Sequence, residues 1–124
     1  MDDIDHVRHM LDAAEEAVLF SRRQSVVMLQ VDRIRSLAIV YCLAVIGEAA
    51  EAVSPEFQKA NPRIPWRVMA NMRHRLIHPD FVVDLLVIFE TTQRDLEPLI
   101  TCLKAILESP YTKPKTARDP RGLV

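Results

Sequence analysis

Apolar residues recur at helical spacing along most of the chain. The first such stretch runs from Ile4 to Phe20, where apolar residues fall three or four positions apart, and this spacing predicts an α-helix with one buried face. Asp2 and Asp3 precede the stretch, and acidic side chains are favoured as N-caps and near a helix start. The polar segment 21–25 predicts the turn that follows.

A second apolar pattern runs from Ser25 to Val53 without a proline and predicts one long helix. Such a helix would be about 43 Å long, at ~1.5 Å per residue. Gly47 interrupts it, and a glycine inside a helix costs about 1 kcal/mol relative to alanine. We therefore expect another backbone to pack closely against Gly47.

Segment 54–65 predicts a connector with a short helical turn, because its Ser-Pro-Glu start is typical of a helix N-terminus. Pro65 then opens a third long helix. Pro79 disfavours helical geometry at the residue before it, so this helix should end near Ile77 or His78.

The last helical pattern begins near Val82 or Asp84, and Pro98 should kink or divide it. Beyond it the chain has little apolar content and three prolines, which predicts a flexible, mostly disordered tail. We divide the chain into a helical domain, residues 1–108, and a basic tail, residues 109–124. The expected fold is all-α, an antiparallel bundle of four or five helices.

Composition agrees with a single soluble globular domain: the chain has 124 residues, of which 49% are hydrophobic and 27% charged. Cys42 and Cys102 lie in apolar helical patterns and predict two buried thiols in a reducing compartment. The acidic N-terminus does not resemble a secretory signal, and the most apolar stretch, 37–50, is too short to span a bilayer. We expect a cytoplasmic protein without a membrane partner.

The net charge of −1 is unevenly distributed. The tail carries +3 and the first 108 residues carry −4. Because nucleic-acid-binding proteins usually have a basic surplus, any surface that contacts RNA must be local.

The segment Asn71–Phe81 gathers candidate chemistry, because it holds Arg73, His74, Arg75 and His78. One interpretation is a metal site, since two histidines four positions apart share a helix face. However, no third ligand is obvious and no Glu lies between them. A second interpretation is an ordinary helix end, where cations are favoured by the helix dipole and the free carbonyl groups.

A third interpretation is RNA cleavage without a metal ion. This reaction needs proton transfers, which histidine can supply near neutral pH, and a cation to stabilise the charged phosphorane, for which arginine is suited. Arg73 and His78 are five positions apart, so an ideal helix points them about 140° apart. Their convergence requires the helix to loosen at Pro79, or a second subunit to complete the site.

The run IGEAAEAVSPEFQKANPRIPWRVMANMRHRLIHPDF resembles the HepT-like group of HEPN-domain proteins. IGEAAEAV closes the second helix, IPWR opens the third, and an Arg followed five positions later by His ends it. Many members of this group are ribonuclease toxins, of type II or type VII toxin–antitoxin systems, encoded beside an MNT-type nucleotidyltransferase antitoxin. The resemblance covers about residues 4–108.

The resemblance implies a homodimer in which Arg73 and His78 of each subunit face one another in a cleft and cleave RNA without a metal or other cofactor. Arg73 would bind and polarise the scissile phosphate, and His78 would act as general acid or base. His74, Arg75 and Asp80 would support them. Two alternatives remain: a non-cleaving HEPN-type partner subunit of a nucleotidyltransferase, and an unrelated helical interaction protein.

The sequence departs from the family pattern at two positions. His74 stands where an Asn commonly follows the motif Arg, and Asp80 stands where many members have a tyrosine that can accept AMP from the antitoxin. The tyrosines of this chain are elsewhere, Tyr41 in the predicted long helix and Tyr111 in the tail. We therefore expect no AMP acceptor at this site, and we expect the Asp80 carboxylate to lie near His78 and to repel RNA phosphate.

Overall fold

The computed structural model describes residues 1–109, and in this range the chain forms eight helices and no strand. The helices, in chain order, are α1 (Asp3–Ser21), α2 (Val26–Val31), α3 (Arg33–Ala52), α4 (Pro55–Ala60), α5 (Trp66–Ala70), α6 (Met72–Leu76), α7 (Leu85–Arg94) and α8 (Leu96–Glu108). The all-α prediction is confirmed. The tail expected for residues 109–124 lies, apart from Ser109, outside the described residues. None of the helices in the described range is long and apolar enough to cross a membrane.

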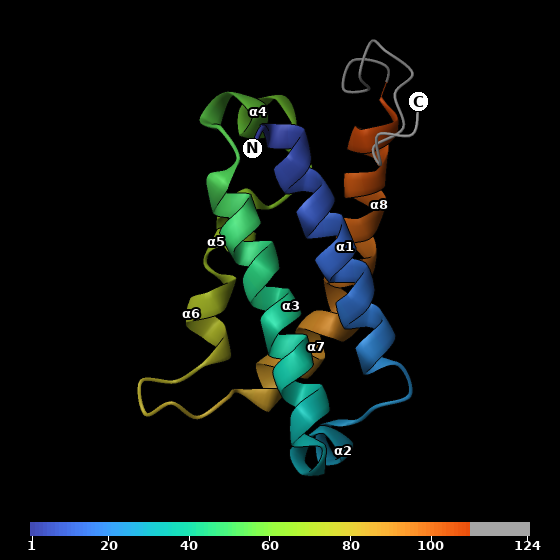
Figure 1. Cartoon of the computed structure of the whole chain (residues 1–124), viewed down its shortest axis with the longest axis vertical. Coiled ribbons are helices and arrows are strands. Elements are labelled where there is room, and N and C mark those ends of the chain that lie inside the picture. Colours follow the sequence, from blue (N-terminus) through green and yellow to red (C-terminus); the bar gives the residue numbers. More distant parts are fainter. Residues whose placement is uncertain (110–124) are drawn as a thin grey trace.

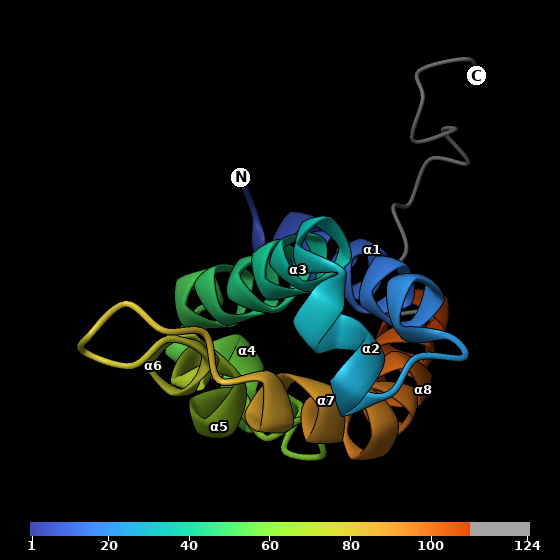
Figure 2. The same ribbon diagram turned by 90° about the horizontal axis from the view of Figure 1, so that it is seen from below.

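The long helices α1 and α3 lie side by side and run in opposite directions (Figure 1). Seen from below, these two helices form one layer of the molecule, and α5, α7 and α8 lie on the other side of it (Figure 2). Asp3 ties the start of α1 to Ser54, the N-cap of α4, because its carboxylate accepts hydrogen bonds from the Ser54 amide at 2.8 Å and the Ser54 hydroxyl at 2.7 Å. The largest fully buried side chains between the layers include Met10, Ile39, Leu43, Ile46, Met72, Leu76, Ile88 and Leu103.

The N-terminus of α1 agrees with the prediction. The Asp2 side chain accepts a hydrogen bond from the Asp5 amide at 2.9 Å, and the Asp5 side chain accepts one from the Asp2 amide at 3.1 Å. This reciprocal capping box satisfies amide groups that the helix itself leaves unpaired.

The prediction of a single long helix for residues 25–53 is wrong, because the helix is interrupted at Asp32 and forms α2 and α3. The Asp32 backbone is not helical, and its side chain accepts a hydrogen bond from the Arg35 amide at 3.0 Å, which makes it the N-cap of α3. That hydrogen bond is the main reason why the pKa of Asp32 is lower than the usual 3.8.

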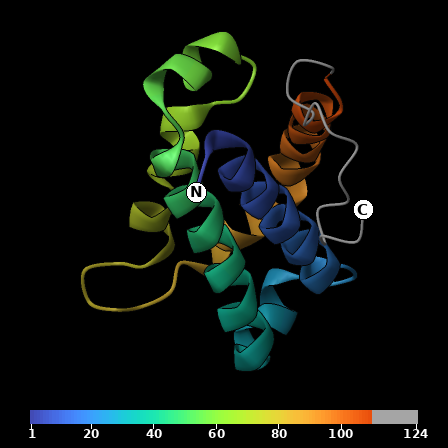
Figure 3. The ribbon, with the colours of Figure 1, turned by 45° about the horizontal axis from the view of Figure 1, so that its top comes forward.

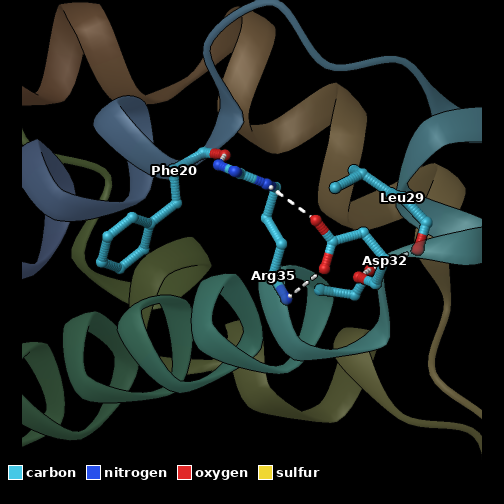
Figure 4. Close-up of polar contacts among 5 residues, drawn as sticks. Phe20, Leu29, Asp32 and Arg35 are labelled. Atoms are coloured by element: carbon cyan, nitrogen blue, oxygen red, sulfur yellow. Dashed lines mark hydrogen bonds and ion pairs between the residues drawn. The ribbon is translucent and has the colours of Figure 1, made fainter.

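Contacts to the neighbouring helices hold this corner in place (Figure 4). Arg35 donates one hydrogen bond to the carbonyl oxygen of Phe20 at 2.8 Å and a second to the Asp32 carboxylate at 3.2 Å. The buried Ser36 hydroxyl donates to the carbonyl oxygen of Leu29 at 2.6 Å. The end of α1, α2 and the start of α3 are thus joined by groups that a continuous helix would place elsewhere.

The third long helix predicted from Pro65 is also interrupted. It divides into α5 and α6 at Asn71, where the His74 amide donates to the Asn71 carbonyl at 3.1 Å, three residues back instead of four. The expectation that another backbone packs closely against Gly47 is confirmed. A Cβ atom there would lie 3.0 Å from the Met69 carbonyl oxygen and 3.8 Å from the backbone nitrogen of Arg73. Helix α3 therefore supports the α5–α6 junction through direct backbone contact.

The remaining predictions for the helices hold. The connector 54–65 contains α4, capped by the Ser54 hydroxyl, which accepts from the Phe57 amide at 3.2 Å. The last pattern divides into α7 and α8 at Asp95, and Pro98 occupies the first turn of α8, where a backbone N–H has no partner within the helix.

Both cysteines are free. Cys42 is buried, and burial raises the pKa of its thiol to about 11. Cys102 is only partly buried, so the prediction of two buried thiols is confirmed for Cys42 alone.

Candidate active site

The segment between α6 and α7 forms a short hairpin that projects from the bundle (Figure 3). Helix α6 ends at Leu76, one to two residues earlier than predicted, and Ile77 and Val83 form an antiparallel bridge. The His78 amide donates to the Val82 carbonyl at 2.9 Å, and the Phe81 amide donates to the His78 carbonyl at 2.8 Å. His78 therefore lies at the base of a three-residue loop, outside any helix.

Arg73 lies in α6 and points toward α3. Its guanidinium forms an ion pair with Glu48, and its second terminal nitrogen lies 3.5 Å from a carboxylate oxygen of Glu51. These two acids are the glutamates of the IGEAAEAV run. The Arg73 side chain stays 43% exposed, so it is held by α3 and still open to solvent.

His78 is paired with a residue that the sequence did not single out. Its Nε2 atom lies 3.1 Å from the Oδ2 atom of Asp84, and its side chain is 55% exposed. Asp84 is the N-cap of α7, because its Oδ1 atom accepts from the Val87 amide at 3.1 Å. The histidine is thus anchored to the start of α7.

The predicted supporting residues are all exposed. Asp80 lies at the tip of the hairpin, where its side chain accepts from the Val82 amide at 3.3 Å. The carboxylate that contacts the His78 ring is therefore that of Asp84, six residues further along the chain, and not that of Asp80. His74 and Arg75 lie in the last turn of α6, where positive charge suits the helix dipole.

Within the described part of the chain, Arg73 and His78 share no hydrogen bond or ion pair. Arg73 is held by α3 and His78 by α7, so each has its own support. We expected Arg73 and His78 to converge either if the helix loosened at Pro79 or if a second subunit completed the site. The helix does loosen, because α6 ends at Leu76. The loosening by itself does not pair the two side chains.

The two histidines of α1 line a groove that includes a contact residue of Arg73. His6 and His9 of α1 line a groove of about 360 Å³ together with Tyr41 and Glu48 of α3. Glu48 is also the ion-pair partner of Arg73, so one glutamate both lines the groove and contacts the arginine. No group of three or more His, Cys, Asp or Glu side chains suited to a metal ion occurs among residues 1–109.

Comparison with known proteins identifies similar chains. The sequence model of the family described as "Ribonuclease HepT-like" matches residues 10–106. The chain is 34% identical over 95 residues to "Probable ribonuclease HepT" of Thermococcus cleftensis, an alignment that covers 77% of this chain and 86% of the relative. It is 35% identical over 77 residues to a "Putative RNase" of Caldanaerobacter subterraneus, covering 62% of this chain and 69% of that protein. No solved structure matches the chain at a comparable level of significance.

Proposed function

Because this chain belongs to the ribonuclease HepT-like family, we propose that it cleaves RNA and that Arg73 and His78 carry out the chemistry. The observation that carries this proposal is the exposure of the two side chains together with their contacts to carboxylates. Both are open to solvent, and both are held by carboxylates from neighbouring helices. A side chain that is already held loses less conformational freedom when it binds a substrate.

In the proposed reaction the ribose 2′-oxygen attacks the adjacent phosphorus and the bond to the 5′-oxygen breaks. One imidazole accepts the proton of the 2′-hydroxyl, and a second group donates a proton to the leaving 5′-oxygen. Arg73 binds the phosphate and stabilises the charge that develops on its oxygens. The products are a 2′,3′-cyclic phosphate and a free 5′-hydroxyl, and no metal ion is needed.

We further propose that the site is completed in a homodimer. One chain supplies one His78, whereas the reaction uses two proton-transferring groups, and a second copy would supply the other. Exposed apolar side chains on α3, on α7 and on the hairpin support such a contact, among them Ile34, Tyr41, Phe81 and Leu86. Light scattering should give twice the mass of the chain, and a monomer at micromolar concentration would contradict the shared site.

We propose an MNT-type nucleotidyltransferase as the partner that restrains this activity in a toxin–antitoxin system. Asp80, at the tip of the hairpin, offers a carboxylate where the family pattern has a phenolic hydroxyl. The partner should therefore inhibit through binding and not through AMP transfer at this position. Mass spectrometry after incubation with the partner and ATP should show an unmodified chain, and an AMP adduct would refute this form of the proposal.

The decisive experiment is incubation of the purified protein with total RNA in the presence of EDTA. The wild type should cleave, and Arg73→Ala and His78→Ala should each reduce the rate at least about a hundredfold. Arg67→Ala is a matched control, because Arg67 is an exposed arginine of α5 outside the proposed site. Cleavage that required added Mg²⁺ would argue against the metal-free reaction.

One observation favours the non-cleaving alternative. Glu48 and Glu51 occupy Arg73 and place negative charge where an RNA phosphate would bind. A HEPN-type subunit that only binds a nucleotidyltransferase would need no free arginine. Expression in cells separates the two functions, because only the ribonuclease should arrest growth in a manner that His78→Ala abolishes.

A further inference from the structure

Asp84 is fixed by three contacts, one through its backbone and two through its carboxylate. Its backbone N–H donates to the Leu76 carbonyl at 2.8 Å, its Oδ1 atom accepts from the Val87 amide at 3.1 Å, and its Oδ2 atom lies 3.1 Å from Nε2 of His78. The Asp84 side chain is 23% exposed and that of His78 is 55% exposed. The acid is therefore the anchored member of the pair, and the imidazole is the member that solvent and substrate can reach.

This geometry constrains the proton on the imidazole. A carboxylate oxygen has only lone pairs to offer, so a ring nitrogen 3.1 Å away must carry the proton, because two lone pairs at that distance would repel. In a neutral imidazole one nitrogen carries hydrogen and the other accepts. With the proton on Nε2, the free acceptor is Nδ1.

We propose that Asp84 is a positioning residue that holds Nε2 of His78 toward the start of α7 and leaves Nδ1 as the nitrogen that exchanges a proton with RNA. This inference rests on the proposed ribonuclease function and assigns the nitrogen that performs it. The same carboxylate caps α7 through its other oxygen, so the helix and the imidazole share one anchor.

The test is the substitution Asp84→Asn. Asparagine caps a helix about as well as aspartate, so its Oδ1 atom can still accept from the Val87 amide. Its Nδ2 atom then replaces the oxygen that faces His78, and a donor at that place favours a proton on Nδ1 and not on Nε2. The variant should keep its helix and invert the tautomer of the histidine.

Two measurements follow this change. Nitrogen-15 spectra of the imidazole, recorded without RNA at alkaline pH, should show the Nε2–H form in the wild type and the Nδ1–H form in Asp84→Asn. With a short single-stranded RNA, kcat should fall about a hundredfold while KM does not rise, because RNA binding does not depend on the tautomer and the variant loses a negative charge beside the site. The melting temperature should stay close to that of the wild type.

Asp84→Ser and Asp95→Asn complete the design. Serine retains a cap but is too short to reach His78, so Asp84→Ser should leave the imidazole free to turn and should lower kcat about tenfold. Asp95→Asn removes the same charge from the N-cap position of α8 and should leave both the spectrum and kcat unchanged.

The outcomes separate the positioning role from the activity. An unchanged tautomer and an unchanged kcat in Asp84→Asn would overturn the positioning role, and an equal loss in Asp95→Asn would reduce it to net charge. If the wild type does not cleave RNA, the proposed function fails, and the tautomer inversion still decides whether Asp84 orients the imidazole. A large fall in melting temperature with no change in kcat would leave Asp84 a helix cap and overturn the proposal.

Discussion

The carbonyl oxygen of Met69 lies 3.0 Å from the point that a Cβ atom would occupy on Gly47. This distance is shorter than ordinary van der Waals contact, so α3 and the end of α5 approach as closely as their backbones allow. The backbone nitrogen of Arg73 lies 3.8 Å from the same point. A glycine about three-quarters of the way along α3 thereby sets how closely α6, which carries the candidate phosphate-binding Arg73, packs against α3.

Gly47→Ala should destabilise the protein by up to about 2 kcal/mol. Alanine gains about 1 kcal/mol of helix propensity over glycine, but overpacking costs about 1–3 kcal/mol when the neighbour is backbone and not a flexible side chain. Urea unfolding monitored by circular dichroism would measure the difference. Gly47→Val should cost more, and a Gly47→Ala protein more stable than the wild type would show that α5 moves aside freely.

Glu48→Gln should strengthen RNA binding about fivefold at low salt. The substitution removes a negative charge next to Arg73, and an interaction between unit charges 4 Å apart is worth about 1 kcal/mol in water. Raising the salt concentration should reduce the gain. Fluorescence anisotropy with labelled RNA would measure it, with Glu97→Gln in α8 as the control for net charge. A gain that persists in the Glu48→Gln, Arg73→Ala double variant could not act through the arginine.

Trp66→Ala should cost ~3–5 kcal/mol of stability, the usual price of deleting a buried aromatic side chain. Trp66 is 7% exposed, and its Nε1 donates a hydrogen bond to the Asn61 carbonyl at 2.9 Å. Its ring packs edge to face with that of Phe57, with the ring centroids 6.3 Å apart. His78→Ala should change stability by less than about 1 kcal/mol, since the His78 side chain is 55% exposed and its contact with Asp84 lies at the surface. Circular dichroism in urea would compare both, and an unfolded His78→Ala protein would make the histidine structural.

Asp32→Asn should lower stability at neutral pH and not at acid pH. The amide of Arg35 holds the pKa of Asp32 below 3.8, so the carboxylate contributes stability above the unfolded-state pKa and loses it as the pH falls through the folded-state pKa. Asparagine still caps α3 but carries no charge. Melting temperatures of the two proteins should differ at pH 7 and converge below pH 3.8, and a constant difference across this range would exclude the linkage.

Most of the fold could be predicted from the sequence, because helical periodicity and N-caps are local. The start of α1 at Asp2 and the start of α4 at Ser54 follow from side chains within three residues of each cap. The breaks at Asp32 and Asn71 could not be read from periodicity, since apolar spacing continues across both. A usable signal was present at Asp32, because aspartate favours the N-cap over a helix interior. The hydrogen bond of Arg35 to Phe20, 15 residues away, depends on the assembled fold.

The candidate site was predictable in its residues and not in its contacts. Arg73 and His78 stand out because residues 73–78 include two arginines and two histidines. Glu48, in contrast, is 25 residues from Arg73 in sequence. Asp84 reaches His78 because the hairpin reverses the chain, and that reversal places Phe81 at φ 68°, a left-handed conformation that bulky residues rarely adopt. A non-glycine residue there costs about 1–2 kcal/mol, so propensity argues against the turn that the fold imposes.

The two halves of the candidate site also differ in local stability, because Arg73 lies in a helix and His78 in the hairpin. Arg73 lies in a helix in which Met72 and Leu76 are fully buried, whereas the hairpin that carries His78 is held by a few backbone hydrogen bonds between exposed residues and by the contact of His78 with Asp84. Segments of the second kind open locally, with free energies far below that of global unfolding. The hairpin should therefore open, and break the His78–Asp84 contact, more often than α6 unfolds around Arg73. The amides of His78 and Phe81 should exchange hydrogen much faster than those of α3. On warming, the hairpin that carries His78 should lose its structure well before the helical bundle melts.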